Sequence, residues 1–176
     1  MLHNCSIFFV LKVFFLEPTK KHYLKEISLK SKLSHTSVKP ILNKLKKEKI
    51  ILEEQEKKGK RNFPIFFSDL NSENYKKYKK IFNLLEIYNL EFLKLIEDNL
   101  MPKSIVLFGS YSRGEDIETS DIDLFIESKK KEIDLNKFEK FFNRKINLHF
   151  SEKLANYPSE LKNSIINGIV LRGYLT

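Results

Sequence analysis

The hydrophobic residues of the first fifty positions recur at intervals of three and four, which places them on one side of a helix. Residues 7–16 form the first such series, and Pro18 just beyond it predicts the end of a helix. A shorter series covers residues 23–27, and a clearer one covers residues 38–45. The pattern predicts three helices, of which the second and third are joined by a tight turn.

A β-hairpin is predicted directly after the third helix. Two strand-like segments, IILEEQ and FPIFF, flank the turn sequence KKGKRN, so the hairpin has a basic tip. Two helices joined by a tight turn and followed by a basic hairpin make the winged-helix arrangement. Residues 1–70 therefore resemble the winged helix-turn-helix domains of archaeal and bacterial transcription regulators.

Residues 71–101 are predicted to connect two domains through one long helix over 72–100. Ser72 is a candidate N-cap, and Pro102 follows the expected end. At 1.5 Å per residue this helix would be about 40 Å long. It carries an apolar stripe at helical spacing, made by Tyr78, Ile81, Leu85, Tyr88, Phe92 and Leu95. Such a stripe is typical of a packed core or of a dimer seam.

Two strands are predicted in the next part of the chain. SIVLF is typical of a buried strand and ends at Gly109, and TSDIDLFIE is typical of a second strand. Because side chains alternate along a strand, Asp121 and Asp123 are expected on one face, about 6–7 Å apart. The residues between and after them, Ile122 and Leu124, are then expected to face the core.

The pattern as a whole predicts an α+β protein with a second domain over residues 102–176. RKINLHF is expected to add a strand to a mixed sheet, and ELKNSIIN to begin a packing helix that ends near Gly168. The first domain would be the winged helix-turn-helix, and the long helix would lie between the two.

Composition narrows the class of protein. The chain has 176 residues, 41% of them hydrophobic, so it is too apolar for a disordered chain. Its one cysteine, Cys5, excludes an intramolecular disulfide framework and a multi-cysteine zinc site, which fits the cytoplasm. The apolar run IFFVLKVFFL is interrupted by Lys12 and is much shorter than the roughly 20 residues of a membrane span. A buried helix is expected there, with no membrane association.

The net charge of +9 lies in the first third of the chain. Residues 1–67 carry 15 Lys/Arg and 6 Asp/Glu, and the remainder carries equal numbers of each. A basic module beside a neutral one predicts a polyanionic partner, for which double-stranded DNA is the candidate. The candidate DNA-binding residues lie on the second helix of the helix-turn-helix and at the hairpin tip, and are Thr36, Ser37, Lys39, Lys44, Lys60 and Arg61. The alternative is a winged helix that docks a protein or dimerises, with the lysines as a solvated face.

The start of the second helix of the helix-turn-helix depends on its cap. Ser34 and Thr36 can both accept a hydrogen bond from a free backbone N–H. Pro40 is tolerated in the first turn of a helix but costs about 3 kcal/mol deeper inside one. This favours Thr36 as the start over Ser34.

The pair of aspartates predicts a metal site. Asp121 and Asp123 have no neighbouring cation in the sequence, so two close carboxylates would repel each other. A divalent cation removes that repulsion, and Mg²⁺, or Mn²⁺ in its place, suits carboxylate oxygens together with substrate phosphates. Gly109 lets the backbone pass close to a ligand, and Ser110 offers a hydroxyl and a main-chain N–H.

The chain has Gly109 and Ser110, then ten further residues, and then the pair Asp121 and Asp123. This motif resembles that of the nucleotidyltransferase superfamily, which includes DNA polymerase beta. Within the superfamily it is most similar to the minimal nucleotidyltransferases. The resemblance covers residues 102–172. It implies that Gly109 and Ser110 hold nucleotide phosphates and that the two aspartates hold metal as catalytic residues. Arg113 could neutralise a phosphate or only brace the loop.

The third carboxylate of that family has no obvious counterpart. The position on the neighbouring strand is Asn147, which can coordinate metal weakly but carries no charge. His149 lies on the same face and could act as base or ligand, although a single histidine on a strand is more often structural. Glu127 shares the strand face of the aspartates but is expected about 13 Å from Asp123.

The resemblance implies a Mg²⁺-dependent enzyme that transfers a nucleoside monophosphate from a nucleoside triphosphate to an unknown acceptor, and releases pyrophosphate. The alternative is a weak or inactive nucleotidyltransferase fold that serves as a DNA-binding transcriptional regulator. A third hypothesis is an antitoxin that modifies a protein toxin, because minimal nucleotidyltransferases often act in this way. A homodimer stays an open alternative.

Overall fold

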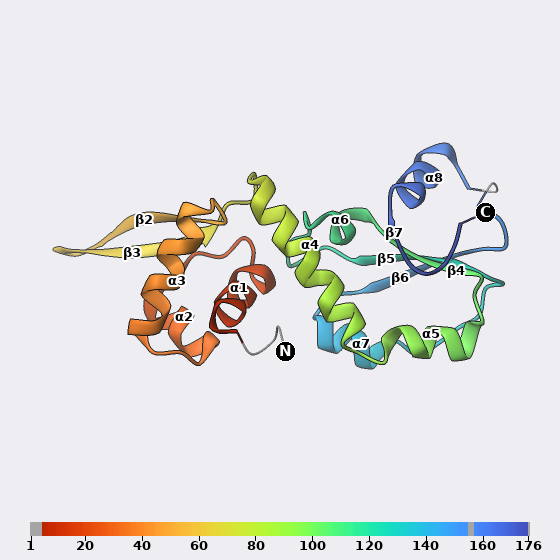
Figure 1. The fold of residues 1–176 in the computed structure, drawn as a ribbon, viewed down its shortest axis with the longest axis horizontal. Helices are drawn as coiled ribbons and strands as arrows, with labels where there is room; N and C mark the ends of the chain where they lie inside the picture. Colours follow the sequence, from red (N-terminus) through yellow and green to blue (C-terminus); the bar gives the residue numbers. More distant parts are fainter. Residues whose placement is uncertain (1–4, 155–156, 176) are drawn as a thin grey trace. The chain divides into compact units, whose positions relative to one another are not determined.

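A computed structural model describes residues 5–154 and 157–175 of the chain (Figure 1). The chain forms two compact units, residues 1–82 and residues 83–176. Helices and strands are mixed in both units, as expected for an α+β protein.

The described part of the first unit contains three complete helices, the first part of α4 (Glu73–Tyr88) and a three-stranded antiparallel sheet. Its elements are, in order, α1 (Ser6–Leu16), β1 (His22–Tyr23), α2 (Leu24–Ser31), α3 (His35–Lys47), β2 (Ile51–Lys58) and β3 (Arg61–Ser68). The strand order is β1-β3-β2, so the short β1 extends the predicted hairpin by one strand. The three predicted helices and the hairpin are confirmed, whereas β1 was not predicted.

Helix α1 is buried in the core of this unit, as its apolar sequence predicts. Val10, Phe14 and Phe15 are almost inaccessible to solvent. The Phe15 ring contacts Tyr75 and Phe82 at centroid distances of 5.5 and 5.3 Å. In the described part of the chain, no helix is both long and apolar enough to cross a membrane.

The N-cap of helix α3 lies two residues earlier than the sequence suggested. The Ser34 side chain is the N-cap and accepts a hydrogen bond from the Ser37 backbone N–H at 3.2 Å, so the preference for Thr36 was wrong. Pro40 consequently lies inside the helix. Because Thr36 and Pro40 are both exposed, water can satisfy the Thr36 carbonyl that has no backbone donor at Pro40.

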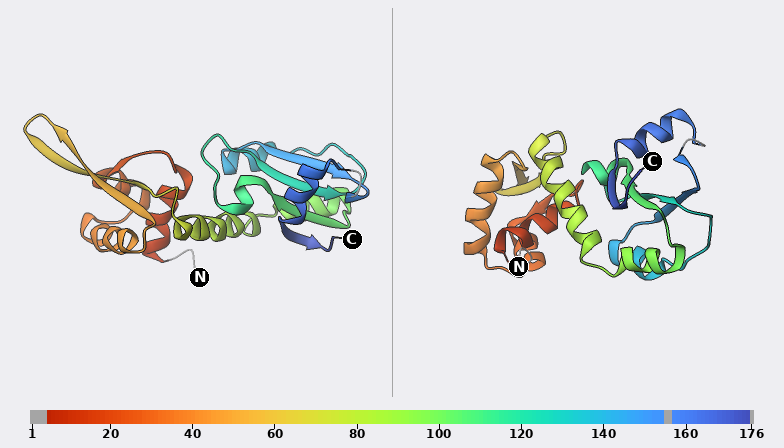
Figure 2. Two further views of the ribbon diagram at one scale, coloured as in Figure 1. Left: turned by 90° about the horizontal axis from the view of Figure 1, so that it is seen from above. Right: turned by 45° about the vertical axis from the view of Figure 1, so that its right-hand side comes forward.

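The hairpin of β2 and β3 is longer than predicted and has a tighter turn. Its last paired residues are Lys58 and Arg61, which leaves a two-residue turn. Gly59 has a φ of +61°, the left-handed conformation that such turns require. The hairpin projects away from the helices of its own unit in Figure 1 and in the left view of Figure 2.

The predicted long helix is instead two helices, α4 (Glu73–Tyr88) and α5 (Phe92–Leu100). The break lets Phe92 pack on Phe138 at a centroid distance of 5.0 Å. Part of the predicted stripe is also not core: the side chains of Tyr78, Ile81 and Tyr88 are 38, 47 and 52% exposed. The helix buries a different face, so the core interpretation was wrong for these three residues.

The second unit is built on a four-stranded mixed sheet. After α5 its elements are β4 (Ser104–Phe108), α6 (Gly109–Arg113), β5 (Ile122–Glu127), α7 (Asn136–Phe142), β6 (Ile146–Ser151), α8 (Ser159–Ile166) and β7 (Ile169–Gly173). The strand order is β6-β5-β4-β7. Strands β5 and β6 are parallel and the other pairs are antiparallel, which confirms the predicted mixed sheet.

Helices cover both faces of this sheet (Figure 1). Ile122 and Leu124 face the core formed with α5 and α7, as predicted, and Phe125 packs with Ile165 of α8 on the other face. The closing helix ends just before Gly168, as predicted, but the chain then forms β7, which was not predicted. Asp123 alternates with Ile122 and Leu124 and therefore lies on the α8 face of the sheet.

Candidate active site

The register of three strands brings the predicted site together. Phe108, the last residue of β4, pairs with Asp123 near the start of β5. Asp123 in turn pairs with Asn147 near the start of β6. Residues 109 and 110, which follow β4, therefore lie at the same edge of the sheet as the aspartates.

Gly109 is in van der Waals reach of the Asp123 carboxylate. Its φ of +75° is a left-handed conformation, and a Cβ built on it would lie 2.7 Å from the Asp123 Oδ2. Any side chain here would be strained and would push on the carboxylate. The sequence motif thus has a steric cause: the loop passes close to the aspartate only because residue 109 is glycine.

Ser110 is half-buried beside this contact. Within residues 5–154 and 157–175 its hydroxyl makes no hydrogen bond, so it can donate to a ligand. The Ser112 hydroxyl, by contrast, donates to the Gly109 carbonyl at 2.8 Å and holds the turn.

Asp121 and Asp123 share one hydrogen-bond donor. The Asn147 Nδ2 group donates to the Asp121 Oδ2 at 3.0 Å and to the Asp123 Oδ1 at 3.2 Å. Both carboxylates therefore lie on the same face, as the strand alternation predicted. The amide occupies the position expected for a third acid, where it donates hydrogen bonds to both carboxylates and adds no negative charge.

His149 is the second neighbour of Asp123. Its Nε2 lies 3.4 Å from the Asp123 Oδ1, and its ring packs edge-on against Phe108 at 5.1 Å. Hydrogen bonds from His149 and Asn147 hold the pKa of the Asp123 carboxyl below its ordinary value, although partial burial opposes this. Asp123 is thus kept ionised.

Glu127 is far from this edge of the sheet, as its sequence position predicts. It pairs in register with Ser151, four residues along β5 from Asp123. Its buried carboxylate accepts a hydrogen bond from the Ser104 hydroxyl at 2.8 Å. Glu127 therefore does not supply the missing third acid.

Arg113 braces its own loop. Its Nε donates to the Glu115 Oε2 at 2.7 Å, and the side chain is 55% exposed. An exposed ion pair of this kind contributes roughly 0–1 kcal/mol, so the guanidinium can leave Glu115 for a phosphate at small cost.

A buried ion pair holds the loop between Gly109 and the aspartates. The Arg144 Nη2 lies 2.8 Å from the Asp116 Oδ2, and these side chains are only 6 and 0% exposed. The Asn83 Nδ2 donates to the Asp116 Oδ1 at 2.8 Å and to the Tyr111 carbonyl at 2.9 Å. The Asn83 side chain thus ties the loop to helix α6, which carries Ser110.

Arg144 also fixes the residues just before Asp121. Its Nη1 donates to the Ile117 and Ser120 carbonyls, and its guanidinium lies 5.9 Å from the centre of the Tyr111 ring. Burial, and the neighbouring Asp116 charge, raise the pKa of the Tyr111 hydroxyl. Sequence reasoning missed this network, because Asn83, Asp116 and Arg144 are far apart in the chain and no motif connects them.

The donor set suits a hard divalent cation. Two carboxylates together with substrate phosphates are the usual ligands of Mg²⁺ in proteins, and Asn147 adds a neutral amide. Among the described residues, no cluster of three or more His, Cys, Asp or Glu side chains is placed to hold a metal ion.

The residues predicted to contact DNA differ in their degree of ion pairing within the protein: some have a carboxylate partner and others have none among the described residues. Thr36, Ser37 and Lys39 are exposed on α3. The Lys44 Nζ lies 3.9 Å from Glu48, a weak exposed pair. Lys39 of α3, and Lys60 and Arg61 at the hairpin tip, make no ion pair with any described residue.

Comparisons with known proteins agree with this geometry. Residues 90–171 match the family model described as "Nucleotidyltransferase domain". A relative from Methanocaldococcus jannaschii, "Putative protein adenylyltransferase MJ1379", is 38% identical over 79 residues, which are 44% of this chain and 74% of the relative. A second from the same organism, "Putative protein adenylyltransferase MJ1215", is 56% identical over 34 residues, 19% of this chain and 40% of the relative. No solved structure matches the chain significantly.

Proposed function

The chain belongs to the nucleotidyltransferase family, and on this premise we propose that it transfers an adenylyl group from ATP to a protein acceptor. The family implies a nucleoside triphosphate as substrate. The names of the two relatives suggest the adenylyl group and the protein acceptor. The observation that carries the proposal is the strand register that places Gly109, Asp121 and Asp123 at one edge of the sheet.

The carboxylates of Asp121 and Asp123 are proposed to hold a divalent ion, Mg²⁺ or Mn²⁺. Bound there, the ion would orient the α-phosphate and stabilise the negative charge that develops on it. When the ion binds, Asn147 would have to give up its hydrogen bonds to the carboxylates, and its amide oxygen could then face the ion. Its neutral side chain leaves the site one negative charge short of the family pattern.

The loop after β4 is proposed to bind the phosphates. Ser110 has a hydroxyl free to donate, and the backbone at Gly109 passes close to the aspartates. Arg113 would exchange its Glu115 partner for a phosphate oxygen. Transfer forms a bond between the acceptor oxygen and the α-phosphorus and breaks the bond to pyrophosphate, while the acceptor loses its proton.

The neutral Asn147 also favours a second candidate function. With two carboxylates instead of three, the domain could bind nucleotide without turnover and serve a DNA-binding regulator or antitoxin as a sensor. Both candidates keep the nucleotide site, and only the first requires transfer.

Labelling separates the two. The protein is incubated with α-labelled ATP, CTP, GTP or UTP, with Mg²⁺ or Mn²⁺, in an extract of host proteins and RNA. The control is the Asp121→Asn/Asp123→Asn variant. Label from ATP in a protein band, lost in the variant, supports the proposal. Label in RNA would contradict the protein acceptor, and label from another nucleotide would contradict ATP as the donor. If the protein is shown to be folded and transfers no label, the regulator remains as the function.

We further propose that the first unit is a winged helix that binds double-stranded DNA. Thr36 and Ser37 at the start of α3 would face the major groove, and Lys39 and Lys44 would contact phosphates. Lys60 and Arg61 would reach the backbone or a minor groove from the hairpin tip. The excess of positive charge in this third of the chain supports the proposal.

A further inference from the structure

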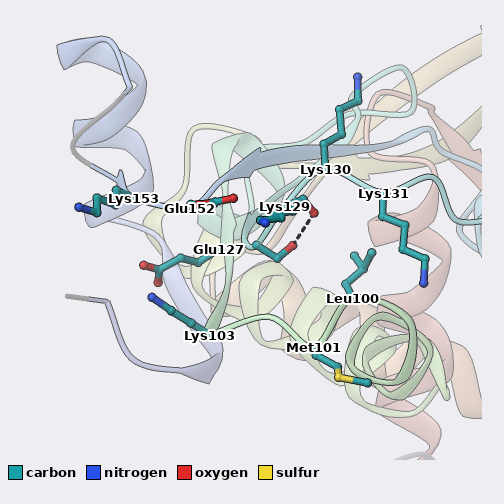
Figure 3. A pocket seen from close by; sticks show the side chains of 10 residues that line it. Leu100, Met101, Lys103, Glu127, Lys129, Lys130, Lys131, Glu152 and Lys153 are labelled. Carbon is teal, nitrogen blue, oxygen red and sulfur yellow. Dashed lines mark hydrogen bonds between the residues drawn. The ribbon is translucent and has the colours of Figure 1, made fainter.

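The second unit has a lysine-lined pocket at the edge of the sheet opposite the aspartates. Its volume is about 570 Å³, and its lining contains five lysines, Lys103, Lys129, Lys130, Lys131 and Lys153 (Figure 3). Lys103 precedes β4, the next three follow β5, and the last follows β6. Because β4 runs antiparallel to β5 and β6 runs parallel to it, these loops meet at one edge.

The pocket is separate from the candidate active site. Glu127, at the end of β5, is part of its wall. Glu127 lies four positions after Asp123 along β5, which corresponds to about 13 Å along the strand. A ligand in this pocket would therefore not be held by the aspartates or by the Gly109 loop.

Most of the lysine charges in the pocket are uncompensated. In the part of the chain that the structure describes, the ammonium groups of Lys103, Lys129, Lys130 and Lys153 make no ion pair or hydrogen bond. Lys131 donates only to the Asn99 carbonyl at 2.9 Å, which leaves its charge unpaired.

Two glutamates reduce the positive charge but do not cancel it. Lys103 points toward the Glu127 carboxylate in Figure 3, and its backbone N–H donates to the Glu127 carbonyl at 3.0 Å. Glu152 is exposed at the rim. Five lysines and two glutamates leave a formal charge of +3 around the pocket.

We propose that this pocket binds a small polyphosphate anion, either an inorganic polyphosphate or the phosphate chain of a nucleotide. Ammonium groups on flexible stems suit phosphate oxygens, since they need no fixed orientation. The volume lies within the range of roughly 300–1,000 Å³ of small-ligand sites, which favours a small anion over a macromolecule. The proposal does not depend on transfer at the aspartates.

The test is an NMR titration of the full-length protein with inorganic triphosphate and, separately, with ATP, both without metal ions. Backbone amide shifts of residues 128–131 and 152–153 report on the pocket alone, whatever the basic first unit binds. The pocket variant is Lys103→Ala/Lys129→Ala/Lys153→Ala. The matched control, Lys94→Ala/Lys140→Ala/Lys162→Ala, removes the same charge from the same unit outside the pocket.

We expect saturable shifts in the wild type, in the control variant and in Asp121→Asn/Asp123→Asn, with an affinity about tenfold lower or more in the pocket variant. Equal affinity for triphosphate and ATP would identify the phosphate chain as the ligand, and tighter binding of ATP would identify a nucleotide. Two outcomes would overturn the proposal: no saturable shift in the pocket at low salt, or unchanged affinity in the pocket variant.

Discussion

Asn147 sets the charge of the candidate active site. Its single amide group donates to both Asp121 and Asp123, which places it where a third carboxylate would share the site. The motif and the strand pattern predicted this position from sequence alone. They did not predict that the amide would link the two aspartates, because hydrogen bonds across strands depend on register.

We expect Asn147→Asp to make the site depend on metal. Without metal, three neighbouring carboxylates repel, and the lost amide bonds add to this, so the free energy of unfolding should fall by on the order of 1 kcal/mol. With Mg²⁺ the added charge should raise metal affinity, so the Mg²⁺-induced rise in melting temperature should exceed that of the wild type. Melting with EDTA and with Mg²⁺ measures both.

Asn147→Ala is the control for that substitution, because it removes the same hydrogen bonds and adds no charge. It should destabilise the protein without metal and gain no larger response to Mg²⁺. An equal response of the Asp and Ala variants would mean that residue 147 does not face the metal site.

Gly109 is expected to be intolerant of a side chain. Gly109→Ala combines a φ of +75° with a Cβ 2.7 Å from the Asp123 carboxylate. It should therefore lower the free energy of unfolding by about 1–2 kcal/mol more than the backbone strain of a positive φ does by itself. It should also reduce nucleotide binding. Gly59→Ala is the matched control, since its φ is +61° and no atom lies within 4 Å of the added Cβ. Denaturant unfolding of the two units measures each cost. Equal costs would show that Asp123 moves aside freely.

At the scale of elements, the pattern of apolar residues predicted the helices and the hairpin well where the apolar residues follow either helical spacing or strand alternation throughout a segment. It failed where packing partners distant in sequence decide the structure. Helix α5 separates from α4 so that Phe92 can reach Phe138, and β7 forms because β4 offers it a free edge. Neither partner is visible in a local window.

The loop between the Gly109 turn and the aspartates is expected to depend on its buried ion pair. Arg144→Met leaves the Asp116 carboxylate buried without its cation, which should cost about 3–5 kcal/mol. Asp116→Leu should cost a similar amount. The double variant should cost much less than the sum, because it leaves no buried charge. Hydrogen exchange of β5 amides in the full-length protein measures these costs, and additive losses would show that the pair is not coupled.

The hairpin tip is expected to carry part of the DNA affinity. Lys60→Ala/Arg61→Ala removes two cations that have no partner in the described chain, so the slope of log affinity against log salt should fall by about 2. Lys46→Ala is the control, because that lysine is paired with Glu53 and should change the slope less. Fluorescence anisotropy with a random-sequence duplex at several salt concentrations measures the slope. An unchanged slope in the tip variant would exclude contact of the hairpin with phosphates.

At the scale of the whole molecule, the two units differ in charge. The first unit carries the excess of positive charge and also contains a buried histidine, His22, whose ring is inaccessible to solvent. Among the described residues, neither ring nitrogen finds a hydrogen-bond partner, and the Glu17 Oε2 lies 3.5 Å from Nε2. Burial lowers the pKa of His22 below 6.5, and the Glu17 charge only partly opposes this.

We therefore expect acid to destabilise the first unit at a pH well above that at which its carboxylates titrate. The folded unit keeps His22 neutral, whereas the unfolded chain binds a proton near pH 6.5, so the free energy of unfolding is constant above that pH. It should fall as the pH drops below 6.5 toward the folded pKa, by at most about 1.4 kcal/mol per pH unit. Urea unfolding between pH 5 and 8, followed by amide signals of α1 and α3, measures this. The slope should vanish in His22→Phe and persist in His35→Ala, whose side chain is exposed on α3. A slope that survives in His22→Phe would assign the pH dependence to another group.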